Sequence, residues 1–263
     1  MAEKKLRLGG MALANGVLVH GPTAWACAVR TPAGELKVAS GSKPRIAISS
    51  DTPVLRGPAR LLEAVLVLPR VRRALPEARF AFERRNVLAT MVAAGVAARA
   101  IRESERLSPV VQELVGGAIS LAPALIALRG GELAAYHGAE HISIGTYEHG
   151  DGAQKEHERC GSHLVGPLIL ASAAGAGLAA RVPERLRKPA SLVASLGAFA
   201  AATELFGWMV RHPQHPVARL LAWPGTELQT RVATADPTPE QVEVAQAALE
   251  ACLELERAAQ SAA

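Results

Sequence analysis

Four apolar stretches dominate the middle of this chain and restrict its fold more than any other feature. They are Asn86–Ala98, Leu107–Leu128, Leu164–Ala180 and Ala190–Val210. The second and fourth are long enough to cross a bilayer as helices, which takes about 20 residues. Alanine is abundant, aromatic residues make up only 3% of the sequence, and small side chains suit closely packed helices in water or in lipid. We therefore expect a mainly α fold, a membrane-associated helical bundle of about four long apolar helices.

Two carboxylates interrupt the longer stretches, Glu113 in the second and Glu204 in the fourth. A carboxylate inside an apolar helix is costly unless it is paired, protonated or bound to a metal. Glu113 and Glu204 are therefore both candidates for functional groups. The alternative is that Glu113 lies in water near a helix start and that Glu204 pairs with an arginine such as Arg211.

The start of the chain has a different composition, rich in Gly, Pro, Val and Thr. Ala24–Arg30 and Glu35–Ala39 predict two strands around a turn at residues 31–34. Arg45–Ser49 is a candidate for a third strand. We expect residues 1–57 to form a small β-rich segment.

The rest of the chain divides into two parts. Residues 58–212 hold the apolar stretches and form the predicted helical core. Residues 213–263 form a C-terminal extension. Within it, Thr238 and Pro239 are helix-entry signals, and Gln241–Arg257 has the spacing of an amphipathic helix.

The densest group of reactive side chains lies at residues 136–163, which contain five of the eight histidines. His137, Glu140 and His141 form an H-x-x-E-H string. In a helix, residues four apart share a face, so both imidazoles can bind one ion. Glu140 then has the place of a general base, as in zinc proteases of the inverted motif. Further candidate ligands follow at a spacing of three: His157, Cys160 and His163.

Zinc is the first choice of metal because it takes nitrogen and sulfur ligands. An iron or manganese centre is the alternative, and it would show more carboxylate ligation, from Glu140, Glu148 or Glu204. Glu148 is also a candidate for orienting the ligands. The plain alternative is a solvated polar loop with Cys160 as a small buried residue.

The charge pattern restricts the partners. The net charge is +5, but no long basic run with interleaved aromatics is present, so nucleic-acid binding is not indicated. Anionic lipid head groups suit this charge better. An arginine-rich amphipathic helix within 58–83 could lie on a membrane surface or on a soluble bundle. A homo-oligomer is an open alternative.

The orientation in a membrane is not fixed by these charges. The connections Arg99–Arg106 and Arg181–Lys188 are both rich in arginine, and both face outward if the preceding segment is cytoplasmic, against the positive-inside tendency. We expect a multi-pass or re-entrant protein of the cell membrane, with the histidine-rich loop on the cytoplasmic side. A soluble bundle is the alternative.

Several strings together resemble the YqhQ-like family, bacterial proteins of unknown function described as predicted metal-dependent enzymes with several membrane spans. The most specific string is Tyr136-His137-Gly138-Ala139-Glu140-His141. The others that match in order include Arg56-Gly57, Tyr147-Glu148, His157-x-Arg159-Cys160-Gly161, Thr203-Glu204-Leu205, Pro224-Gly225 and Leu228-Gln229. The resemblance implies a metal site and a membrane setting, and His163 stands where the family tends to have Ser or Thr.

Two functions follow as hypotheses. The first is a zinc-dependent membrane hydrolase that acts on a peptide or a lipid-linked bond. Its metal would be bound by His137, His141 and one or both of His157 and Cys160, with Glu140 as general base. The second is a membrane or assembly scaffold, stabilised by a structural zinc site with four protein ligands. The substrate is not specified by the sequence.

Overall fold

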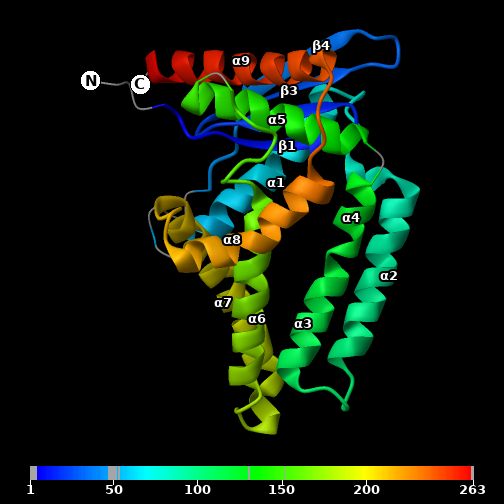
Figure 1. Ribbon diagram of the computed structural model, residues 1–263, viewed down its shortest axis with the longest axis vertical. Coiled ribbons are helices and arrows are strands. Elements are labelled where there is room, and N and C mark those ends of the chain that lie inside the picture. Colours follow the sequence, from blue (N-terminus) through cyan, green and yellow to red (C-terminus); the bar gives the residue numbers. More distant parts are fainter. Residues whose placement is uncertain (1–4, 47–51, 53, 130, 151, 262–263) are drawn as a thin grey trace.

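The computed structural model describes residues 5–46, 52, 54–129, 131–150 and 152–261. The molecule has two layers (Figure 1). One layer holds a β-sheet covered by helices α5 (Glu132–His149) and α9 (Pro239–Ser261). The other holds long helices that extend away from the sheet. The prediction of a mainly helical protein with an N-terminal β segment is therefore confirmed.

The sheet has four antiparallel strands in the order of the chain. They are β1 (Gly9–Leu13), β2 (Gly16–His20), β3 (Ala24–Arg30) and β4 (Leu36–Ser42). The predicted strand pair corresponds to β3 and β4, which run from Arg30 paired with Leu36 to Ala24 paired with Ser42. The strand expected at Arg45–Ser49 falls largely outside the described residues.

The two central strands of the sheet, β2 and β3, are buried on both faces, which explains why they read as nearly continuous apolar runs. Val17 and Val19 belong to a core shared with α5 and α9. Leu18 and Cys27 belong to a second core, shared with α1 (Arg56–Ala74). Alternate residues of one strand thus point to different layers.

Helix α9 is tied to the sheet by a buried carboxylate. Glu256, which is 2% exposed, accepts hydrogen bonds from the backbone N–H groups of Thr23 and Ala24, both at 2.7 Å. The hydroxyl of Thr23 donates to the other carboxylate oxygen at 2.8 Å. The N-terminal and C-terminal segments of the chain therefore share one core.

The remaining helices form the second layer and its connections. After α1 come the short η1 (Ala81–Glu83), α2 (Arg85–Arg102), α3 (Pro109–Ser120) and α4 (Ala122–Leu128). After α5 come η2 (Gly161–Leu164), α6 (Val165–Ala179), α7 (Glu184–Arg211), α8 (Pro216–Leu228) and the π-helical turn η3 (Gln229–Ala233).

Among the described residues, three helical segments are long and apolar enough to cross a membrane: Pro109–Leu128, Gly161–Ala179 and Glu184–Arg211. Four had been expected. The stretch Asn86–Ala98 lies in α2, which does not qualify. Its apolar run is bounded by arginines in the first and last turns, and it is shorter than the roughly 20 residues that a bilayer requires.

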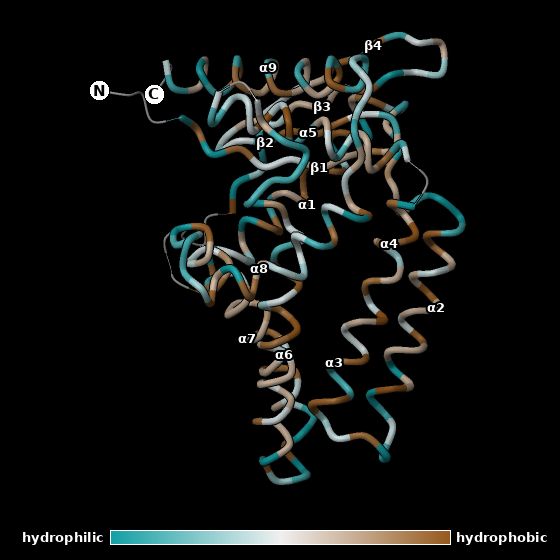
Figure 2. Tube along the Cα trace, viewed as in Figure 1, coloured by the Kyte–Doolittle hydropathy of each residue, from teal (hydrophilic) through white to brown (hydrophobic). Residues whose placement is uncertain are grey.

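The distribution of hydropathy follows the two layers (Figure 2). The long helices are largely hydrophobic, and the turns at their far ends are hydrophilic. Between the sheet and these helices lie α1 and α8, which expose apolar side chains such as Leu61 and Leu62 on α1 and Leu220 and Trp223 on α8. Exposed apolar side chains of α1 and α8 therefore lie near the point where the long helices begin.

Candidate metal centre

Helix α5 carries the H-x-x-E-H string through the core, between β1 and α9. Most of its residues are buried, as expected for a helix that is covered on several sides. Gly138 is needed by a close approach, because a Cβ atom there would lie 2.3 Å from the carbonyl oxygen of Ala235. The N–H group of Ala235 donates to the carbonyl of Ala134 at 3.0 Å. The segment between η3 and α9 is thus fastened to α5 beside the string.

His137 and His141 present their rings on one face of α5, with ring centroids 4.3 Å apart. The Nδ1 atom of His137 donates to the carbonyl of Ala233 at 2.8 Å. The Nδ1 atom of His141 donates to the carbonyl of Lys155 at 2.5 Å. Metal-binding histidines characteristically donate their second ring N–H to such a carbonyl, which fixes the tautomer. Both Nε2 atoms therefore carry a free lone pair.

Cys160 brings a sulfur atom to the same place from the loop before η2. Its Sγ lies 3.5 Å from His137 Nε2, and the ligand atoms of His137, His141 and Cys160 all lie within 4.8 Å of one another. In a tetrahedral zinc site with bonds of about 2.3 Å to sulfur and about 2.0 Å to nitrogen, those two ligand atoms are about 3.5 Å apart. The three side chains therefore fit a zinc ion.

Burial determines the protonation of His141 and Cys160. It lowers the pKa of His141 to about 3, with the neighbouring His137 adding to the effect. The imidazole is therefore neutral at physiological pH, the form that binds metals. Burial raises the pKa of the Cys160 thiol, so this group would lose its proton when it binds a cation.

Glu140 lies beside the cluster without a partner of its own. It is 6% exposed, and among the described residues no hydrogen bond or ion pair reaches its carboxylate. Burial raises its pKa to about 7, while the neighbouring His137 acts in the opposite direction. A pKa near neutrality suits a general base. The backbone of β1 lies directly against this group, because a Cβ atom on Gly10 would be 2.3 Å from Glu140 Oε1.

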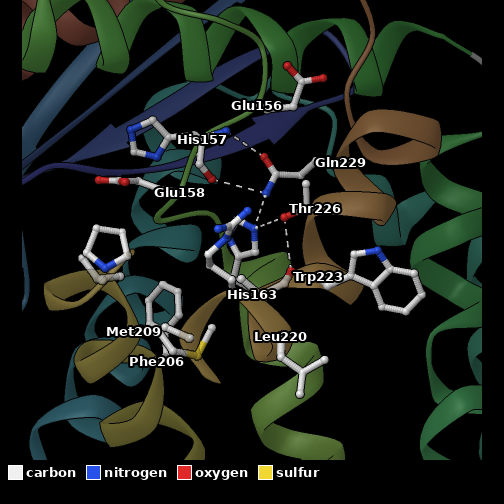
Figure 3. Close-up of a pocket in the computed structure, with 15 residues that line it drawn as sticks. Glu156, His157, Glu158, His163, Phe206, Met209, Leu220, Trp223, Thr226 and Gln229 are labelled. Carbon is white, nitrogen blue, oxygen red and sulfur yellow. Dashed lines mark hydrogen bonds between the residues drawn. The ribbon is translucent and has the colours of Figure 1, made fainter. Parts of the chain in front are cut away.

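The loop that carries Cys160 is held by Gln229, at the start of η3. Figure 3 shows its side chain between His157 and His163. Gln229, 1% exposed, accepts from the N–H of His157 at 2.8 Å and donates to the hydroxyl of Ser162 at 2.9 Å. Sequence reasoning did not assign it a role. The only signal was its place in the Leu228-Gln229 match to the resembled family.

His157 lies next to the cluster rather than in it. Its ring centroid is 5.5 Å from that of His141, and its Nε2 is 3.3 Å from Glu148. Glu148 also forms an ion pair with Arg159. A second group has ligand atoms close enough together to hold a metal ion. It consists of Glu148, His149 and His157. Through these contacts with His157 and Arg159, Glu148 holds the loop that leads to Cys160.

The side chains of His163 and Glu204 have hydrogen-bond partners outside the cluster of His137, His141 and Cys160. His163 Nε2 lies 3.2 Å from the hydroxyl of Thr226, at a cavity of about 620 Å³ lined by α7 and α8 (Figure 3). Glu204 accepts from Arg56 Nε at 2.8 Å and from the N–H of Val54 at 3.1 Å. The structure therefore gives Glu204 an arginine partner at the start of α1.

One further histidine lies at the cluster, although it was not among the predicted ligands. His20, at the end of β2, lines a small cavity of about 160 Å³ together with His137, Glu140 and Cys160. This proximity could not be predicted, because it depends on the pairing of β2 with β1, which brings His20 opposite Gly9, and neither strand was predicted.

Fold and site together define a helical protein with membrane-compatible helices and a buried His/Cys cluster. Residues 131–255 match the model of a family described as a protein of unknown function, DUF1385. This range begins at α5 and includes the whole cluster and all but the last turns of α9. No curated protein and no solved structure matches the chain.

Proposed function

We propose that this protein is a zinc-dependent hydrolase of a membrane, with His137, His141 and Cys160 as ligands and Glu140 as general base. The observation that carries the proposal is the geometry of the cluster: three ligand atoms within 4.8 Å of one another beside a buried carboxylate with no partner among the described residues. The resemblance to the YqhQ-like family, which is compatible with the DUF1385 domain, supports the same reading.

The chemistry divides between metal and protein. When bound, zinc supplies a Lewis acid that lowers the pKa of water and polarises a carbonyl. Glu140 accepts a proton from the attacking water and transfers it to the leaving group, so one water is consumed as one bond is cleaved. Ala233 and Lys155 hold the two imidazoles in the required tautomer through their carbonyl oxygens.

The number of ligands favours catalysis over a scaffold role. A catalytic zinc site has three protein ligands and an open position, whereas a structural site is closed by a fourth. His157 is the available fourth ligand, but its ring is turned to Glu148. A structural zinc site that fastens the loop to α5 is the alternative, and movement of His157 toward the cluster would produce it.

The membrane setting rests on the three long apolar segments and on the exposed apolar side chains of α1 and α8. Membrane lipids are accordingly the proposed partners. Extraction of the protein from cell membranes by carbonate at high pH, without detergent, would contradict this setting.

Elemental analysis of purified protein tests the metal site. We expect one equivalent of zinc in the wild type and its loss in both His137→Ala and Cys160→Ala. His212→Ala is the matched control, because that side chain is exposed and belongs to neither group of candidate ligands, so it should leave the metal in place. Full occupancy in the Cys160→Ala variant would overturn the proposed ligand set.

The catalytic assignment needs a separate test. Glu140→Gln should keep its zinc and lose about 10²- to 10⁴-fold in hydrolytic rate, measured on a panel of fluorogenic esters and peptides. X-ray absorption should show one sulfur and two imidazole ligands plus a light atom not supplied by the protein. A spectrum with three imidazoles and one sulfur, together with unchanged hydrolysis in Glu140→Gln, would identify a structural site.

A further inference from the structure

A second cavity opens onto the cluster from the side of the long helices. It has a volume of about 410 Å³, within the range of small-molecule sites. Leu121, Leu125 and Leu128 of the α3–α4 segment line one side, and Val165 of α6 lines another. Its lining also includes His137, Glu140 and Cys160, the groups of the proposed active site.

The apolar walls belong to segments that can cross a membrane. Leu121–Leu128 ends the segment Pro109–Leu128, and Val165 lies near the start of Gly161–Ala179. The seven steps from Leu121 to Leu128 span about 10 Å along a helix. The cavity therefore runs from the hydrocarbon-facing helices to the cluster.

Such a cavity suits a hydrocarbon chain better than a peptide. The side chains along α4 are apolar and offer no hydrogen-bond partner, so peptide N–H and C=O groups would be left unsatisfied there. A hydrocarbon chain has no such groups and gains free energy on burial. The polar side chains of the lining, which are His137, Glu140, Cys160 and Ser162, all belong to the cluster or to the residues next to it. This division between apolar wall and polar end matches an amphiphile.

Resting on the proposed function, we propose that this cavity binds one acyl chain of a glycerophospholipid and places its carboxyl ester at Glu140 and the metal ligands. The water oxygen would bond to the acyl carbon, and the bond from that carbon to the glycerol oxygen would break. The proton taken up by Glu140 would pass to the glycerol oxygen. The products are a fatty acid and a lysophospholipid, and no other reactant is needed.

Photolabelling of the full chain tests where the acyl chain lies. The protein is placed in vesicles of phosphatidylethanolamine and phosphatidylglycerol that contain phosphatidylglycerol with a diazirine near the acyl carboxyl group. We expect adducts on Leu133 and Ala233, which line the cavity and are only 7% and 4% exposed. Bulk lipid does not reach these residues. Adducts confined to outward-facing residues such as Val110 and Leu178 would overturn the proposal.

A blocked cavity should abolish this labelling. Ala124→Trp fills it from α4, and Val165→Trp fills it from α6. Ala93→Trp is the matched control, because Ala93 is an exposed alanine of the apolar helix α2 that does not line the cavity. We expect the Leu133 adduct to fall to background in both blocking variants and to remain in the control. Persistence of the adduct in either folded blocking variant would contradict the proposal.

The acyl-chain site and the metal site can fail independently. Labelling is measured after treatment with a chelator, and zinc is measured on untreated protein. Leu133 adducts in a protein that never binds zinc would support the acyl-chain site and refute the hydrolase. One equivalent of zinc without Leu133 adducts would refute the acyl-chain site and leave the metal site standing.

Discussion

His137 Nδ1 and the carbonyl oxygen of Ala233 form a hydrogen bond of 2.8 Å although 96 residues separate them in the chain. Ala233 ends η3, a π-helical turn, and π-helical turns are frequent at functional sites. Gln229, at the other end of that turn, holds the loop of Cys160. One short turn thus positions ligands from both α5 and the loop.

Gln229→Leu should therefore weaken the metal site without removing a ligand. The change leaves the N–H of His157 and the hydroxyl of Ser162 without their partner, which costs about 1–3 kcal/mol in the free energy of unfolding. We expect zinc affinity to fall by about 10- to 100-fold, as for other residues that orient ligands. Competition with a chromogenic chelator measures it. Gln246→Leu, at an exposed position of α9, is the control, and equal affinities in the two variants would contradict the role of Gln229.

Gly10→Ala should displace the general base and spare the metal. The new Cβ atom would overlap Glu140 Oε1, so the carboxylate has to move. Such overpacking costs about 1–3 kcal/mol. We expect hydrolysis to fall while the zinc content stays at one equivalent. In Gly95→Ala, a helical position with open space, activity should be unchanged and the helix slightly stabilised. Loss of zinc in Gly10→Ala would show that β1 supports the ligands rather than Glu140.

His20 should make the folded protein sensitive to acid. Burial lowers its pKa from 6.5 to about 4, with Lys43 adding to the effect and Glu63 opposing it. Between these two pH values the unfolded chain binds a proton that the folded protein excludes. The stabilising contribution is therefore complete above pH 6.5 and is lost as the pH falls toward 4, by up to about 3 kcal/mol.

His20→Asn should remove this part of the pH dependence. Denaturant unfolding in detergent, at several pH values between 4 and 7, measures the slope. The wild type should lose more stability than the variant over this interval, and other buried histidines contribute equally to both proteins. His212→Asn, at an exposed position, should keep the wild-type slope. Parallel slopes for wild type and His20→Asn would refute the assignment.

Glu256→Ala should be strongly destabilising. Removal of the carboxylate leaves two backbone N–H groups and the Thr23 hydroxyl unsatisfied in the core. Hydrogen bonds to charged groups contribute about 1.5–3 kcal/mol each, and their losses are not additive, so we expect a loss of about 3–5 kcal/mol in the free energy of unfolding. Glu250→Ala, an exposed position on the same helix, should change it by less than about 0.5 kcal/mol. A small effect at Glu256 would mean that water replaces the carboxylate.

Elements that depend mainly on residues close together in the chain could be predicted from the sequence. The strands β3 and β4 followed from a short turn between two apolar runs, and α9 followed from its entry signals. The shared face of His137 and His141 follows from the helical repeat alone. Strands β1 and β2 were not predicted, because glycines such as Gly9 and Gly10 are ordinarily signals of turns. In the structure a glycine is needed at position 10 because the carboxylate of Glu140 lies close to its backbone.

Contacts between distant segments could not be predicted in the same way. The approach of Cys160 to His137 depends on Gln229, which binds a loop 72 residues away. The prediction of a fourth membrane span was wrong because the apolar run in α2 is too short. The hydrogen-bond partner of Glu204 is Arg56 and not the expected Arg211. This pairing depends on the packing of α1 against α7, which a local sequence pattern does not reveal.

The covering of α5 by α9 sets an order of events during synthesis. Helix α9 follows every ligand in the chain and completes the core around α5 and the sheet. While a ribosome still holds that last helix in its exit tunnel, the nascent chain has neither the covering of α5 nor the anchoring of the sheet by Glu256. The proposed metal site is therefore complete only after α9 has been translated and has packed against α5 and the sheet.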